Sequence, residues 1–318
     1  MTTFLASSRM PRRSSLIRQL PLIALAAALI IYALMTPSFF SWSNMSAIMS
    51  SIGPVGLVGV GMTVIMISGA LFSLSLGISA TVASMLFLWA LQYGVVESIG
   101  LTVVVSALYC AIQGFLVGAI GANPIIVTLA AGTLLAGITA SVSGGSGVTP
   151  PLGVDLDFLS ARPLGIPMAV WCLAGATVVL ELLMRRTTTG WRVYLLGDNP
   201  SAARLAGLRV MKLYVLVFAI AGAAAALAGI LVAGITHSAN LTANPTLTFD
   251  AIAAALVGGT AVTGGRGSVS RTVLGAVAIA VLSDLVVLNG YSTGFQILIK
   301  GSLVLSVVLV SGFGSRGE

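Results

Sequence analysis

The sequence predicts an all-α polytopic membrane protein with about ten transmembrane or half-spanning helices. Of its 318 residues, 58% are hydrophobic and 7% are charged, and the mean hydropathy is +1.10. Such a chain has too few polar side chains to cover a soluble surface. Apolar stretches long enough to cross about 30 Å of hydrocarbon recur along it. The net charge of +7 lies mainly between these stretches, which indicates membrane topology rather than nucleic-acid binding.

We expect one transmembrane domain over residues 19–313, built from ten hydrophobic segments. Two of the segment groups, 48–92 and 250–289, are interrupted by glycines, so that some of their helices can be half-spanning. The segments are 19–37, 48–68, 72–92, 99–120, 123–143, 168–184, 213–235, 250–264, 270–289 and 294–313.

The positive-inside rule orients these segments. Four arginines precede the first segment, so the N-terminal tail, residues 1–18, is expected in the cytoplasm. A cleaved signal peptide is the alternative, but no clear small-x-small cleavage site follows the first apolar run, and we favour an uncleaved anchor. Alternation then places the loop 144–167 outside, and the loop 185–212 and the C-terminal tail 314–318 in the cytoplasm.

Neither a metal site nor a disulfide is expected. Cys110 and Cys172 both lie in apolar segments, and the lone histidine, His237, has no clustered partner in the sequence. We therefore expect no cofactor on this chain.

The stretch from Arg185 to Lys212 is the one long polar run with strong positive charge, with six cations against the single acid Asp198. Within it, Asp198 or Asn199 can cap a short helix that starts near Pro200, because both side chains accept hydrogen bonds from first-turn amides. Gly207 can end that helix with a positive φ. So short a helix is marginal alone, so it must pack on this protein's own surface or on a partner.

Glycines punctuate two regions of the sequence that lie in opposite halves of the chain. They are Gly59, Gly61, Gly69 and Gly77 in the first half, and Gly258, Gly259, Gly264, Gly265 and Gly267 in the second. Broken segments in corresponding places predict a translocation pathway, although close helix packing would use the same residues. The candidate pathway residues are Gly69, Ser73, Ser75, Gly77, Gly258, Gly259 and Thr260.

Three ionisable residues fall inside or at the ends of the late segments. Asp284 and Lys300 lie at similar depth in two antiparallel segments, so we predict that they pair, because an unpaired charge there is expensive. We interpret this pair as structural, with a role in binding the substrate as the alternative. Asp250 is expected to cap the eighth segment near the outer interface, or alternatively to face an outer partner or the entering substrate.

Two long motifs, GWRVYLLGDNPSAARLAGL (190–208) and FDAIAAALVGGTAVTGGRGSVSRTVLGA (249–276), resemble the permease subunits of ribose- and xylose-type ABC sugar importers. The chain is similar, more distantly, to permeases for branched-chain amino acids. The resemblance extends from residue 59 to the last span. It implies a bacterial inner-membrane protein that transports a monosaccharide.

The resemblance also implies partners and a coupling role for the cytoplasmic loop. The partners would be two ATP-hydrolysing subunits, an outer solute-binding protein and a second permease copy or paralogue. The chain has no G-x-x-x-x-G-K-[ST] phosphate loop, so ATP and Mg²⁺ would be used by the partner subunit. The implied coupling residues are Gly197, Asp198, Asn199, Pro200, Ala202, Ala203, Arg204 and Gly207.

One departure from the family pattern leaves the substrate open. Family members commonly carry Gly-x-Asp-Leu-Ser-Val-Gly at the start of the third span, whereas this sequence has Ser73 where the Asp would be and an extra residue before it. Ser73 and Ser75 can offer hydroxyls to a substrate, or can bond their own helix backbone. Amino acids or other small polar solutes stay alternatives. A stand-alone secondary transporter or channel is the alternative from another class, with Asp284 as its one candidate coupling carboxylate.

Overall fold

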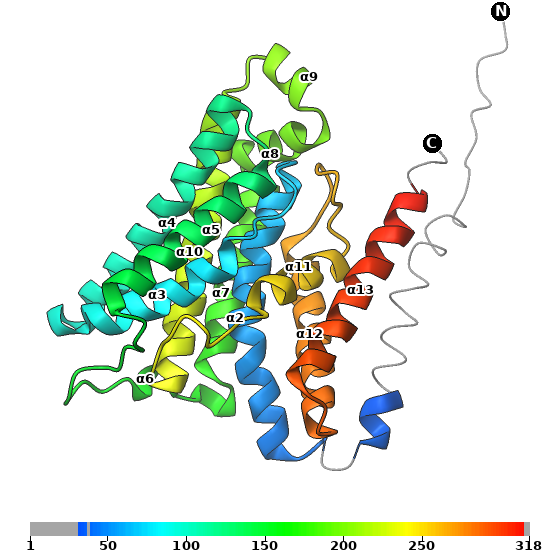
Figure 1. The fold of residues 1–318 in the computed structure, drawn as a ribbon. Coiled ribbons are helices and arrows are strands. Elements are labelled where there is room, and N and C mark those ends of the chain that lie inside the picture. Colours follow the sequence, from blue (N-terminus) through cyan, green and yellow to red (C-terminus); the bar gives the residue numbers. More distant parts are fainter. Residues whose placement is uncertain (1–30, 37–38, 315–318) are drawn as a thin grey trace, which may run out of the picture.

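The computed structural model describes residues 31–36 and 39–314, and this part of the chain is mostly helical (Figure 1). Its one β-type contact is an isolated bridge between Val148 and Ala239. The helices are α2 (Trp42–Ile67), α3 (Leu76–Ala90), η1 (Leu91–Tyr93), α4 (Val95–Ile120), α5 (Pro124–Ser143), α6 (Asp157–Ser160), η2 (Pro163–Gly165), α7 (Met168–Arg186), α8 (Thr188–Asp198), α9 (Pro200–Leu205), α10 (Val210–Thr236), α11 (Leu247–Val257), α12 (Val269–Leu288) and α13 (Thr293–Gly314).

The all-α membrane class is confirmed, but the count of ten spans is not. Seven helices in the described residues are long and apolar enough to cross a membrane: α2, α3 with η1, α4, α5, α7, α10 and α12. The segment expected over 250–264 is shorter than predicted, because α11 has only 11 residues. The segment expected over 294–313 corresponds to α13, and most of the segment expected over 19–37 lies outside the described residues.

Helices α2, α3 and α10 form the centre of the bundle, since 78%, 67% and 61% of their most apolar windows are buried, against 11% for α5. Small residues bring α2 and α10 close together. A Cβ added to Gly61 of α2 would lie 3.1 Å from the Cα of Ala221 in α10. Gly59 and Gly61 therefore serve helix packing and do not interrupt α2.

The real breaks fall next to α3 and α11. Residues 69–75 are non-helical and include two positive φ angles, +80° at Gly69 and +56° at Leu71. Residues 258–268, hereafter the α11–α12 loop, are also non-helical. Figure 1 shows that this loop rises from α11 to the end of the bundle where α8 and α9 lie. The glycine pattern thus located both breaks.

The polar stretch 185–212 folds into two helices where the sequence predicted one. The predicted helix is present as α9. The additional helix, α8, begins after Thr187, whose hydroxyl accepts a hydrogen bond from Gly190 N at 3.1 Å. Threonine at this position is an ordinary cap, so the signal was in the sequence.

Candidate functional site

The short helix α9 is fixed by caps at both ends. Asn199 Oδ1 accepts hydrogen bonds from Ser201 N at 3.1 Å and Ala202 N at 3.0 Å. Pro200 occupies the first helical position, where its missing amide hydrogen costs nothing. Gly207 follows the helix with a φ of +77°. Of the two capping candidates, Asn199 is the one that caps.

The two faces of α9 have different surroundings. Ala203 is 4% exposed and packs on the protein itself, whereas Leu205 is 91% exposed. Ala202 and Arg204 are exposed as well. One face of the helix therefore packs on its own bundle. The other face, which includes the side chain of Leu205, is exposed. Leu205 was not among the predicted coupling residues.

Gly197 and Asp198 lie in the last turn of α8, pressed against two other segments. A Cβ at Gly197 would overlap the carbonyl oxygen of Ile67 and lie 2.5 Å from Gly265 N. Gly69, which was predicted to line the pathway, is located here and not in the bundle interior: a Cβ on it would lie 3.1 Å from the Cα of Gly197. The end of α2, the end of α8 and the α11–α12 loop thus meet at a junction of glycines.

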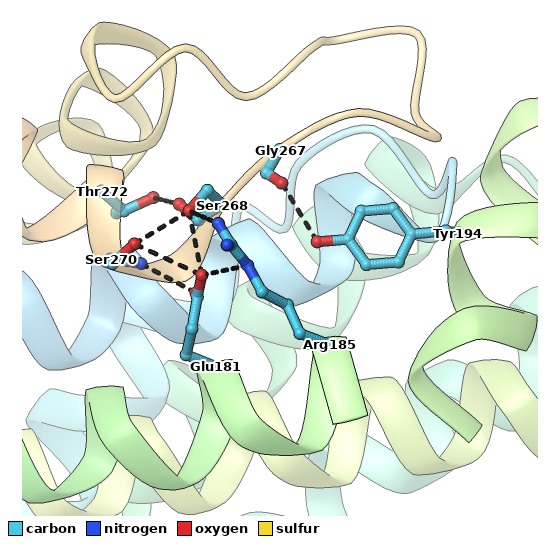
Figure 2. A network of polar contacts seen from close by, with 7 residues as sticks. All are labelled: Glu181, Arg185, Tyr194, Gly267, Ser268, Ser270 and Thr272. Carbon is cyan, nitrogen blue, oxygen red and sulfur yellow. Dashed lines mark hydrogen bonds and ion pairs between the residues drawn. The ribbon is translucent and has the colours of Figure 1, made fainter. Parts of the chain in front are cut away.

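Polar side chains fasten the same loop to α7 and α8 (Figure 2). Glu181 of α7 accepts hydrogen bonds from Ser270 N at 3.0 Å and from Ser268 Oγ at 3.2 Å. Arg185 lies 2.5 Å from the same carboxylate and donates to Ser268 Oγ at 3.1 Å. Tyr194 of α8 donates to the carbonyl oxygen of Gly267 at 3.0 Å.

The surroundings of Glu181 and Tyr194 favour the charge of the carboxylate and the protonated form of the hydroxyl. The carboxylate of Glu181, a residue of α7, lies at the first turn of α12, where a negative charge is stabilised by the free amides and the helix dipole. Burial raises the pKa of Tyr194, and the charge of Glu181 raises it further, so the hydroxyl stays protonated and can donate. Glu181 and Tyr194 were missed at the sequence level. Tyr194 lies within the first resembling motif, but its spacing alone does not reveal a partner.

A second polar cluster lies inside the bundle, between α3, α4 and α5. Ser75 Oγ donates to Gln113 Oε1 at 2.7 Å, and Ser73 Oγ lies 3.1 Å from Ser75 Oγ. Thr128 Oγ1 accepts from Leu74 N at 3.1 Å. Ser73, Ser75 and Gln113 are each at most 1% exposed, and Gln113 Nε2 has no partner among the described residues. We call Ser73, Ser75 and Gln113 the interior polar cluster.

Ser75 bonds across to α4, and Ser73 bonds Ser75, so the hydroxyls of these two serines bond side chains and not their own backbone. Gln113 was missed, although an amide inside the 26-residue apolar helix α4 is a recognisable signal. Gly77 follows the cluster in α3, and a Cβ on it would overlap Thr248 Oγ1 at the start of α11.

The other predicted pathway residues lie at the far end of α11. A Cβ on Gly258 would lie 2.7 Å from the Cα of Thr272 in α12. Gly259 has a φ of +83°, and Thr260 is buried with no partner for its hydroxyl among the described residues. The fold therefore does not bring Gly258, Gly259 and Thr260 together with Ser73 and Ser75.

The predicted pairing of Asp284 with Lys300 is wrong. Lys300 Nζ lies 2.7 Å from Asp250 Oδ1, and both residues are buried. Asp284 Oδ2 instead accepts a hydrogen bond from Asn44 Nδ2 at 2.8 Å. The prediction rested on depth along two helices, which does not give the direction of a side chain around the helix axis.

Asp250 does lie in the first turn of α11, where Thr246 Oγ1 donates to its Oδ2 at 2.9 Å. Asp250 and Lys300 are both buried, at 6% and 4% exposure. In the described residues no group of histidine, cysteine and acidic side chains could hold a metal ion.

Comparison with known proteins assigns the class. Residues 44–310 match the family described as branched-chain amino acid transport system / permease component, and the chain belongs to this family. It is therefore a membrane-spanning permease subunit of an ABC importer. Its seven membrane-length apolar helices in the described residues agree with a multi-pass protein of the inner membrane.

The chain is similar to several curated permeases over nearly its whole length. It is 33% identical to the ribose import permease protein RbsC of Bacillus subtilis, over 91% of each chain. It is 32% identical to the protein of that name in Haemophilus influenzae, over 94% of each chain. The L-arabinose transport system permease protein AraH of Escherichia coli is 26% identical, over 93% of this chain and 91% of its own. No solved structure gives a significant match.

Proposed function

We propose that this chain forms the translocation pathway of an ATP-driven importer for a monosaccharide, with a pentose as the first candidate. Support for the sugar comes from relatives named for ribose and L-arabinose import. The interior polar cluster is chemically suited to such a cargo, because hydroxyl and amide groups exchange hydrogen bonds with the hydroxyls of a sugar.

The observation that carries the coupling role is the presentation of α9. It is capped, seated on the bundle through Ala203, and exposes Leu205 at the end of the bundle (Figure 1). An exposed leucine on a rigid short helix is suited to a groove on a partner protein. We propose that the partner is the cytoplasmic ATPase subunit, which binds ATP and Mg²⁺, while this chain binds no cofactor.

We further propose that the α8–α9 end faces the cytoplasm and that both termini lie in the cytoplasm, a proposal supported by the positive charge of residues 1–18 and 185–212. A solute-binding protein would deliver the sugar at the opposite end. A second permease, either an identical copy or a paralogue, would pack beside this one. Support for such a neighbour comes from α5, which is the least covered of the membrane-length helices.

The test is transport by the reconstituted complex of permease, ATPase and binding protein in proteoliposomes. Ribose, arabinose, xylose, hexoses and branched-chain amino acids would be offered at equal concentration. We expect ATP-dependent uptake of one or a few monosaccharides. Uptake of amino acids in place of sugars would contradict the substrate class, and uptake without the ATPase would contradict the importer mechanism.

A further inference from the structure

The α11–α12 loop is attached to the α8 end of the bundle at three separate places. Its glycines pack against α8 so closely that a Cβ on Gly265 would lie 2.9 Å from the backbone of Asp198. Gly265 N also donates to the carbonyl oxygen of Ile67 at 2.9 Å, which ties the loop to the end of α2. Beside this junction, Tyr194 holds Gly267, and Glu181 holds Ser268 and Ser270 (Figure 2).

The two helices that the loop joins, α11 and α12, extend from it into the bundle and make further contacts there. At the start of α12, Thr272 Oγ1 donates to Ser268 O at 3.2 Å and lies 2.5 Å from Thr63 Oγ1 of α2. On the other side, α11 leads inward. With 11 residues, it is about 16 Å long.

The inner end of α11 lies against the start of α3, next to the interior polar cluster in the chain. Thr248, in the first turn of α11, lies against Gly77, which is two residues from Ser75. Asp250, in the same turn, is joined to Lys300 of α13. A displacement of the α11–α12 loop would therefore reach the start of α3 through one short rigid helix.

The α11–α12 loop has the most adaptable backbone among the segments that meet α8. It contains five glycines, and Gly259, Gly264 and Gly265 have positive φ angles. Helices α7 and α10, which flank α8 and α9 in the chain, are long and continuous, and α10 is packed in the bundle centre. A movement of α8 relative to the bundle is absorbed more easily by a glycine-rich segment than by such helices.

We propose that Tyr194 and Glu181 are coupling residues: they make the α11–α12 loop and α11 follow the movement of α8, and so transmit the action of the ATPase to the interior polar cluster. This inference rests on the proposed docking of the ATPase at α9. Tyr194 and Glu181 act as positioning residues, since neither faces the proposed docking surface of α9 or the interior polar cluster.

The test separates transmission from docking. The reconstituted complex would carry Y194F, which removes one hydroxyl, and separately E181Q, which removes one charge. We expect intact assembly with the ATPase and intact ATP hydrolysis in both variants. The solute moved per ATP hydrolysed should fall by about five-fold, the change in an equilibrium that the loss of one hydrogen bond of ordinary strength produces.

Two matched variants act as controls. Tyr214 is a buried tyrosine of α10, and its hydroxyl has no hydrogen bond to the described residues, so Y214F should keep the wild-type ratio. Glu97 is an exposed acid in the first turn of α4, so E97Q should do the same.

A wild-type ratio of transport to hydrolysis in both Y194F and E181Q would overturn the proposal. Loss of the ATPase from either purified complex would overturn it too, because the residue would then act in assembly. Failure of the wild-type complex to bind the ATPase or to move a monosaccharide would instead contradict the proposed function itself.

Discussion

Lys300 Nζ lies 2.7 Å from Asp250 Oδ1, and this buried ion pair joins α13 to the first turn of α11. Thr246 donates to the other carboxylate oxygen, so both ends of the pair are held. Removing one partner of such a pair leaves a charge buried without compensation.

We therefore expect K300M to destabilise the permease by about 3 to 5 kcal/mol. The double variant D250N/K300M should recover a large part of this loss, since neither charge then remains. Thermal unfolding in detergent measures both. K212M is the matched control, because Lys212 is an exposed lysine and its loss should leave the stability unchanged. A K300M protein as stable as the wild type would show that the pair does not form.

The exposed face of α9 gives a prediction about assembly. Leu205 is 91% exposed, so L205E is compatible with the fold but places a charge where the ATPase groove is proposed. Affinity for the ATPase should fall at least about ten-fold, which corresponds to 1.4 kcal/mol. Titration of detergent-solubilised permease with the ATPase subunit measures it. The control is L152E, because Leu152 is fully exposed in the 144–167 loop. Equal affinity of L205E and L152E would refute the docking role.

The exposure of Ala202 and Ala203, two residues that were expected to contact the ATPase, predicts different effects for their substitution. Ala202 is exposed, and A202E should weaken ATPase binding without unfolding the protein. Ala203 is buried against the bundle, so A203E should destabilise α9 itself. Proteolysis of the 185–212 stretch distinguishes the two: faster cleavage is expected in A203E only.

The glycine junction predicts a strong steric effect at one position. A Cβ on Gly197 would overlap Ile67 O, so G197A should cost about 1 to 3 kcal/mol through overpacking. Gly175 lies in the middle of α7 with no atom within 4 Å of its Cβ position, so G175A should be neutral or slightly stabilising. Thermal unfolding in detergent measures the stability of both variants. A stable G197A protein would mean that the three segments can separate.

The interior polar cluster predicts a loss of transport. The double variant S73A/S75A removes both hydroxyls from the cluster and leaves the Gln113 amide without its donor. Sugar uptake per ATPase-bound complex should fall, and the free energy of unfolding should fall by about 1 to 3 kcal/mol. Ser50 bonds only the backbone of its own helix, so S50A is the control. Unchanged uptake in S73A/S75A would exclude these serines from the pathway.

The sequence was informative wherever the signal is local. Uninterrupted apolar runs gave the membrane helices, because any backbone in hydrocarbon must satisfy its own hydrogen bonds. The cap at Asn199, the first-turn Pro200 and the positive φ at Gly207 are decided by residues within one turn, and all three were readable. The glycines near Gly69 and Gly264 likewise marked the breaks.

The tertiary structure decided which residues meet. Asp284 bonds Asn44 of α2 and Lys300 pairs with Asp250 of α11, and sequence spacing carries no information about which helix each side chain faces. Gly69 faces α8 and not the bundle interior, and Gln113 completes the cluster of Ser73 and Ser75 from a helix about forty residues away. Local order is set by neighbouring residues in the chain. The two polar networks depend on side chains from separate helices, and only the packed bundle brings these together.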